Sequence, residues 1–180
     1  MQNLLGCFRL ESVKVGDYNP EEVDEFEKEI SIKRVVQHEN FTTMGLDYDI
    51  CLVELEDSIE LVPGHVEAVN ITEVEADAGV MCTVAGWDSD HSSMMKIQYP
   101  MADCDLAYGD EMGPGMICAG YEAGGVGVCN GYIGSPMMCD NTHVSGLSSW
   151  GYGCAMPMSP DVFTSVAFYN QWIKDQLSSI

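Results

Sequence analysis

The feature that most constrains the fold is a series of short segments rich in strand-forming residues, with turn residues between them. Segment 30–36, Ile-Ser-Ile-Lys-Arg-Val-Val, alternates as a strand with one buried face does. Similar segments are 13–15, 49–55, 79–87, 136–139 and 144–150. Only the end of the chain has helical spacing, with apolar residues recurring on one face at Phe168, Tyr169, Trp172, Ile173 and Leu177. This pattern predicts an all-β architecture with one terminal helix.

The charge limits the classes of partner. The 180 residues carry a formal net charge of −22, with a pI near 4.1. Such a charge argues against nucleic acid or an anionic membrane as a partner and favours cationic ones. Of the 29 acidic residues, 21 lie in the first hundred positions. They form either a solvated acidic face or a docking surface for a basic protein. No run of about 18 apolar residues predicts a membrane-spanning helix.

Eight cysteines in a chain of this size indicate disulfides and an oxidising compartment. Their spacings do not match a zinc site. The sequons at Asn40 and Asn70 are N-glycosylation acceptors, compatible with secretion. The first residues lack the basic segment and long apolar run of an export signal. We therefore expect either that the natural N-terminus lies elsewhere or that export takes another route.

Several motifs occur in a fixed order along the chain. The first half has Gln-His-Glu-Asn-Phe at 37–41 and Leu-Asp-Tyr-Asp-Ile-Cys-Leu at 46–52. The second half has Met-Ile-Cys-Ala-Gly at 116–120, Cys-Asn-Gly-Tyr-Ile-Gly-Ser-Pro at 129–136, Ser-Ser-Trp-Gly-Tyr-Gly-Cys-Ala at 148–155 and Trp-Ile-Lys at 172–174. Together they resemble the motifs of the trypsin-like serine proteases, and the resemblance covers nearly the whole chain.

This resemblance implies a chymotrypsin-like fold, in which two antiparallel β-barrels pack together with the active site in the cleft between them. A C-terminal helix follows the second barrel. The first barrel is expected to be incomplete at its N-terminus. Residues 1–72 would form the remainder of that barrel, and residues 73–180 the C-terminal barrel and the helix.

The resemblance also implies a catalytic triad, which this sequence does not retain. The family's nucleophile loop runs Cys-x-Gly-Asp-Ser-Gly-Gly-Pro, and here Ile133 stands at the serine and Tyr132 at the preceding aspartate. Gly6 stands where the family's Ala-Ala-His-Cys segment has the catalytic histidine. Neither isoleucine nor glycine can supply a nucleophile or a general base. Only Asp49 of the triad remains, and we expect it to accept hydrogen bonds, for instance from Ser149.

Other positions of the family's site are retained or altered. Gly131 matches an oxyanion-hole residue, and the pocket walls match at Ser149, Trp150, Gly151 and Gly153. Gly127 stands where trypsins carry the pocket aspartate. Asp161 replaces a pocket glycine, and in a few collagen-degrading crustacean members an acid on this wall confers a preference for basic residues. Two interpretations stay open: Asp161 forms a pocket for a basic peptide, or it is solvated or blocks a vestigial pocket.

The resemblance pairs Cys82 with Cys139, Cys104 with Cys118, and Cys129 with Cys154. Cys7 matches a half-cystine whose partner in the family lies upstream of the given chain. Because Cys51 falls at an apolar core position, we expect a buried free thiol there rather than a Cys7–Cys51 bridge.

The segment from residue 17 to residue 27 resembles the family's calcium loop. Asp17, Asp24 and Glu27 fall on its carboxylate ligands, and Asn19 and Glu22 on its backbone-carbonyl ligands. Calcium prefers several oxygen ligands, which one such loop can supply. Acidic residues are so frequent in this region that a solvated acidic loop fits equally well. We expect no cofactor other than this calcium ion.

The sequence thus predicts a secreted, non-catalytic homologue of the trypsin-like proteases, a pseudoprotease. It would bind a protein or peptide, preferably a basic one, or regulate a proteolytic cascade. One alternative is a partial or faulty copy of an active secreted serine endopeptidase, or an enzyme that uses a different nucleophile such as Ser135. A further alternative is an acidic extracellular matrix or storage protein.

Overall fold

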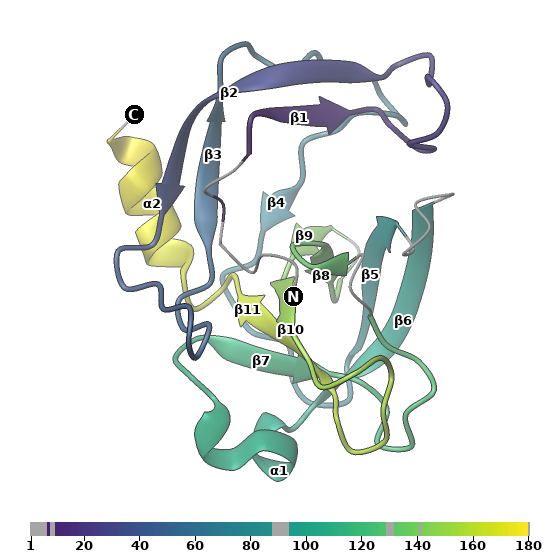
Figure 1. Ribbon diagram of the computed structural model, residues 1–180, viewed down its shortest axis with the longest axis vertical. Helices are drawn as coiled ribbons and strands as arrows, with labels where there is room; N and C mark the ends of the chain where they lie inside the picture. Colours follow the sequence, from purple (N-terminus) through teal and green to yellow (C-terminus); the bar gives the residue numbers. More distant parts are fainter. Residues whose placement is uncertain (1–6, 8–9, 88–93, 129–131, 141, 180) are drawn as a thin grey trace.

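The computed structural model describes residues 7, 10–87, 94–128, 132–140 and 142–179. As predicted, the chain is mostly β-structure with a helix near its C-terminus. A three-stranded sheet of order β1-β2-β3 lies at one end of the molecule, and a closed barrel of order β10-β11-β7-β6-β5-β8 lies at the other (Figure 1).

The sheet consists of β1 (Ser12–Val15), β2 (Lys28–Gln37) and β3 (Cys51–Leu55), all antiparallel. β2 pairs with both neighbours, and its register against β3 shifts between Ile32 and Arg34. Ile30 on β2 is buried, whereas its chain neighbours are exposed. This is the alternation that the sequence predicted for a strand with one buried face.

The barrel is built from antiparallel pairs and encloses the main core. Its strands are β5 (Met81–Trp87), β6 (Met94–Ala102), β7 (Met116–Ala119), β8 (Pro136–Met138), β10 (Gly146–Trp150) and β11 (Asp161–Ser165). The buried residues of this core are Cys82, Val84, Tyr99, Met101, Ala119, Val128, Tyr132, Met137 and Phe163. β5 alternates clearly between buried and less buried residues, whereas β11 is buried throughout.

A second core joins the three-stranded sheet to the C-terminal helix. It contains Ile50, Val144, Val166, Tyr169 and Ile173. Figure 1 shows helix α2 (Asn170–Ser178) in yellow, lying beside β2 and β3. The short strand β4 (Asn70–Ile71) pairs in parallel with β9 (His143–Val144), which adds another connection between the two halves of the chain.

The prediction that helical structure occurs only at the end of the chain is wrong. A short helix α1 (Cys104–Tyr108) and a 3₁₀ turn η1 (Gly109–Glu111) follow β6. The Asp103 side chain caps α1 by accepting a hydrogen bond from the Asp105 amide at 3.0 Å. Five residues make little more than one helical turn, too few for a 3.6-residue pattern to be recognisable. The strand predicted over 144–150 is also divided, because β9 ends before Ser145 and β10 begins after it.

Two of the predicted disulfides, Cys82–Cys139 and Cys104–Cys118, are confirmed. Cys154 is also disulfide-bonded, but its expected partner Cys129 lies outside the described residues. The expectation of a free thiol at Cys51 is wrong, because Cys51 forms a disulfide with Cys7. Their Cα atoms lie 6.5 Å apart, within disulfide reach, and Cys51 is only half-buried at the edge of β3. These bridges indicate an oxidising, extracellular compartment.

Among the described residues, no helix has the length and apolar character needed to cross a membrane.

Candidate functional site

Asp49 lies just before β3 and is held by two strands of the barrel. Its Oδ2 accepts a hydrogen bond from Ser149 Oγ of β10 at 2.6 Å, as the sequence predicted. Its backbone carbonyl accepts one from Thr164 Oγ1 of β11 at 2.9 Å. Burial raises the pKa of the Asp49 carboxyl, and the bond from Ser149 opposes that shift. No histidine is among the contacts that the described residues make with Asp49.

The turn that contains Ile133 connects the barrel core to the surface. Tyr132 is 3% exposed and packs in the main core, whereas the next side chain, Ile133, is 51% exposed. Gly134 has φ +86°, and its amide donates to the Ser148 carbonyl at 2.8 Å. The turn therefore presents a hydrocarbon side chain to solvent, and this group can neither attack a carbonyl nor lose a proton. Gly6 and Gly131 lie outside the described residues.

Ser135 does not stand free in this turn. A Cβ atom added at Gly86 of β5 would lie 2.5 Å from Ser135 Oγ and 2.6 Å from Tyr132 Cδ1. Both side chains thus lie against the backbone of β5 at Gly86. The described contacts include no hydrogen bond between Ser135 and a histidine, so they give Ser135 no general base.

Asp161 begins β11 and is only 4% exposed. Its Oδ2 accepts a hydrogen bond from the Val128 amide at 2.7 Å. A Cβ atom at Gly127 would lie 2.7 Å from Oδ2, and one at Gly151 would lie 3.2 Å from Oδ1. The carboxylate therefore fills the space between two glycines. Burial raises the pKa of Asp161 to about 6, and the bond from Val128 opposes the shift.

Two further positions of the predicted pocket wall are Trp150, which ends β10, and Gly153, which lies in the segment after it. Trp150 makes edge-to-face contacts with Tyr108 and Tyr152, at centroid distances of 5.0 and 5.7 Å. Gly153 has φ +81°, which glycine adopts without strain. Of the predicted wall residues, Gly127 and Gly151 border Asp161 directly, and Trp150 pairs with Val162, the residue after Asp161.

A cavity of about 660 Å³ opens next to this wall, and the sequence did not predict it. One side is formed by Trp150, Gly151 and Tyr152, and the other sides by residues 44–47 and 110–113. Three of the lining residues are acidic, namely Asp47, Asp110 and Glu111, and none is Lys or Arg. Tyr152 donates its hydroxyl to Glu111 Oε2 at 2.6 Å. Gly151 lines this cavity and also borders Asp161, so the two acidic regions are contiguous.

The Trypsin family model matches residues 6–173 of the chain. The chain belongs to the trypsin family. It is 34% identical to Trypsin-1 of Salmo salar over 176 aligned positions, and the alignment covers 93% of this chain and 72% of that protein. It is 32% identical to Serine protease 1 of Rattus norvegicus, over 93% of this chain and 71% of the relative. It is 31% identical to Anionic trypsin of Bos taurus, with the same coverage.

The loop that matches the calcium loop of the trypsin family does not form an ion cage in this arrangement. Lys14 Nζ lies 2.8 Å from Glu27 Oε1 and 3.8 Å from Asp17 Oδ2. Asp24 instead accepts hydrogen bonds from the amides of Tyr18 and Asn19. Among the described residues, no group of three or more acidic, histidine or cysteine side chains is placed to hold a metal. The residues as placed do not fit calcium, and calcium binding stays a prediction.

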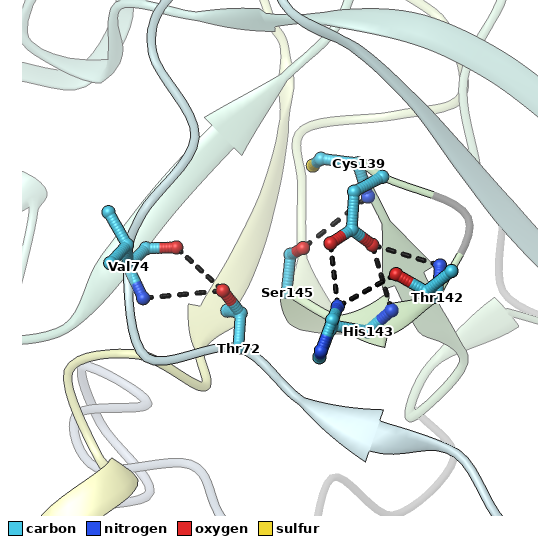
Figure 2. Close-up of polar contacts among 7 residues, drawn as sticks. Thr72, Val74, Cys139, Thr142, His143 and Ser145 are labelled. Atoms are coloured by element: carbon cyan, nitrogen blue, oxygen red, sulfur yellow. Dashed lines mark hydrogen bonds and ion pairs between the residues drawn. The ribbon is translucent and has the colours of Figure 1, made fainter.

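A carboxylate–histidine pair of another kind lies outside the trypsin-family site. His143 begins β9, and its Nδ1 atom lies 2.6 Å from Asp140 Oδ2 and 2.8 Å from Thr142 Oγ1. Figure 2 shows the contact between His143 and Thr142. In a triad the acid and the nucleophile contact opposite ring nitrogens. Here both partners contact the same nitrogen, and Ser145 Oγ accepts from the Cys139 amide instead (Figure 2). This cluster therefore organises a turn and does not have the geometry of a catalytic triad.

His38 has a structural position. Its ring is stacked on Tyr48 and Trp172, at centroid distances of 4.8 and 4.9 Å, and meets the edge of Tyr169. Its Nδ1 atom accepts a hydrogen bond from the Asn40 amide at 3.2 Å. The ring is buried between the first sheet and α2, away from solvent. A trypsin-family base at this place would have no access to a substrate.

The two sequons are accessible, because Asn40 and Asn70 are both exposed. Asn70 lies in β4, and Thr72 of its sequon exchanges hydrogen bonds with the backbone of Val74 (Figure 2). Glycosylation at either position stays a prediction.

Proposed function

We propose that this chain is a secreted trypsin-family protein that does not catalyse hydrolysis and acts by binding a basic segment of another polypeptide. The observation that carries the proposal is the exposed hydrocarbon side chain of Ile133 in the turn where the family has its nucleophile. The family is one of serine endopeptidases, and their chemistry begins with proton removal from that serine. An isoleucine has no atom for this step.

The surroundings of Asp49 support the same conclusion. In a working triad the buried aspartate holds the histidine in one tautomer and stabilises its charged form. Here the carboxylate is bonded to Ser149, and burial raises its pKa. The sequence places Gly6 where the histidine would be. Asp49 therefore acts as a structural acceptor between the two halves of the chain.

The preference for a basic ligand is supported by two adjacent acidic regions. The Asp161 carboxylate is buried, and its described contacts include a backbone amide but no cationic side chain. The neighbouring cavity adds Asp47, Asp110 and Glu111 with no Lys or Arg in its lining. An arginine side chain offers five N–H donors that match carboxylates, and it retains its charge when desolvated. A segment that contains arginine complements both regions.

A protein that holds such a segment without cutting it shields the segment from active proteases. In this way the proposed binding would regulate proteolysis by competition, because trypsin-like enzymes with acidic pockets bind the same basic segments.

The loss of catalysis is tested with a fluorophosphonate probe, which labels activated serines. We expect no labelling of the folded wild type, beside full labelling of an active trypsin. Ile133→Ser should stay unlabelled as well, because the sequence supplies no base to activate the new hydroxyl. Labelling of the wild type would overturn the proposal, and a Ser135→Ala variant would then show whether Ser135 is the nucleophile. Circular dichroism verifies that each sample is folded.

Ligand binding is tested by fluorescence anisotropy with an arginine-containing peptide and a matched citrulline peptide. We expect the arginine peptide to bind more tightly, and Asp161→Asn to weaken its binding by roughly tenfold, because one buried charge partner is lost. Asp105→Asn on the exposed face of α1 is the control with the same change in charge. Equal affinity for the two peptides would contradict a basic ligand. An unchanged affinity in Asp161→Asn or Asp161→Gly would exclude Asp161 as the recognising group.

A further inference from the structure

The acidic loop between β1 and β2 is closed around a lysine. Lys14 belongs to β1, and its Nζ atom lies 2.8 Å from Glu27 Oε1 and 3.8 Å from Asp17 Oδ2. The two carboxylate side chains are only 13% and 8% exposed. The hydrogen bond with Glu27 is the main cause that raises the pKa of Lys14, so this ammonium stays charged at neutral pH.

The other carboxylate of the predicted ion site is already occupied. Asp24 Oδ2 accepts the Tyr18 amide at 2.5 Å and the Asn19 amide at 3.0 Å, and this holds the middle of the loop together. Asp17 Oδ1 is buried and has no hydrogen-bond partner among the described contacts. Within the described residues, the Lys14 ammonium is therefore the cation that Asp17 and Glu27 share.

We propose that the Lys14 ammonium takes the place that a divalent ion would occupy in this loop, as a built-in counter-ion that makes closure of the loop independent of calcium. The inference does not depend on the proposed ligand-binding function. It rests on two observations. Two largely buried carboxylates converge on the Lys14 ammonium, and Asp17 Oδ1 has no hydrogen-bond partner among the described contacts.

The chemistry of the loop gives the consequence of removing that ammonium. Asp17 and Glu27 would then be two neighbouring, poorly solvated negative charges without a counter-charge, which repel each other. Carboxylates together with loop carbonyls, such as that of Asn19, are hard oxygen donors of the kind that calcium prefers. A chain without the lysine should therefore require from solution the cation that it no longer carries.

The loop is also linked to the barrel. The Tyr18 carbonyl accepts a hydrogen bond from Trp87 Nε1 at 3.1 Å, and Trp87 ends β5. Opening of the loop would break this bond and change the surroundings of the indole ring. Tryptophan fluorescence is therefore a local readout of loop closure, beside global stability.

The experiment compares four proteins by thermal unfolding in EDTA and in millimolar calcium chloride: the wild type, Lys14→Met, Lys14→Arg and Lys28→Met. Lys28 is exposed on β2, and no ion pair of it is among the described contacts, so its variant controls for the change in net charge. We expect the wild type and Lys28→Met to have the same Tm with and without calcium. Lys14→Met should lose roughly 2–4 °C in EDTA and regain it with calcium, and Lys14→Arg should behave as the wild type. Tryptophan fluorescence should likewise change only in Lys14→Met in EDTA, and calcium should reverse that change.

Three outcomes would overturn the inference. The first is calcium binding by the wild type in calorimetry, with a gain in Tm, because the ion would then have its own site. The second is a Lys14→Met variant that is unaffected in EDTA, because the ammonium would then hold nothing. The third is a destabilised Lys14→Met variant that calcium fails to restore, because the ammonium would then not occupy a cation site.

Discussion

Ser149 on β10 donates a 2.6 Å hydrogen bond to Asp49, a residue one hundred positions earlier in the chain. This bond joins the segment before β3 to the closed barrel. We expect Ser149→Ala to lower the free energy of unfolding by about 1–3 kcal/mol, because the half-buried carboxylate loses its donor. Urea unfolding measures the change. The control is Ser148→Ala on the same strand, where the described contacts give the hydroxyl no hydrogen bond. Equal losses in both variants would show that the Asp49 bond contributes nothing.

The Cys7–Cys51 disulfide closes a long loop, with a sequence separation of 44. Replacing both cysteines by alanine should cost about 2–4 kcal/mol, because the unfolded chain gains freedom. Thiol titration in guanidinium, without reductant, should find neither Cys7 nor Cys51 free, and peptide mapping should recover them as one linked pair. A free thiol at Cys51 would restore the expectation that the structure overturned.

The buried Asp161 carboxyl predicts a pH dependence with a definite sign. Its pKa is about 6 in the folded protein, against about 3.9 in an unfolded chain. Between about pH 4 and pH 6 the folded state keeps a proton that the unfolded state has released, so stability decreases as pH rises through this window.

Asp161→Asn keeps an oxygen acceptor for the Val128 amide. It removes the carboxyl group that titrates in this window. In urea unfolding between pH 4 and pH 7, the free energy of unfolding of the variant should therefore increase relative to that of the wild type as pH rises. Parallel stability curves for the two proteins would contradict the raised pKa. Binding of an arginine peptide to the wild type should strengthen over the same window, because the carboxylate acquires its charge.

Gly16, at the start of the acidic loop, has φ +70°, and a Cβ atom there would overlap the Phe26 carbonyl oxygen. Gly16→Ala should therefore cost about 1–3 kcal/mol of stability through strain, with a further loss from displacement of Phe26. The matched control is Gly64→Ala, where φ is +82° but a Cβ would meet nothing within 4 Å. Thermal unfolding should rank Gly16→Ala well below Gly64→Ala, and equal losses would mean that the contact with Phe26 is unimportant.

Among the strands that the sequence identified, β2 and β5 each have one more deeply buried face. β2 and β5 alternate between buried and less buried residues, and both were predicted close to their observed bounds. β11 was not predicted, because all five of its residues are buried and no period of two is visible. The short helix α1 was not predicted for a different reason. Its formation depends on the N-cap at Asp103 and not on an amphipathic repeat.

The candidate site was predictable only where the family resemblance fixed a position. Ile133, Asp49 and Asp161 were found in this way. The acidic cavity was not, because residues 44–47 and 110–113 are distant in sequence and meet only through the fold. The ion pairs of Lys14 with Asp17 and Glu27 could not be predicted either. The alternation of a strand predicts that a lysine is exposed, but not which carboxylates its ammonium contacts.

The stack of His38 between Tyr48 and Trp172 has a consequence for the order of events during synthesis. His38 and Tyr48 are translated more than a hundred residues before Trp172. Tyr169 and Ile173, which belong to the same core, are also translated late. Until these late residues leave the ribosome, the early aromatic rings and Ile50 have no permanent cover. The nascent first sheet therefore leaves this apolar surface uncovered until those residues have been synthesised, and a chaperone would bind the chain during this interval.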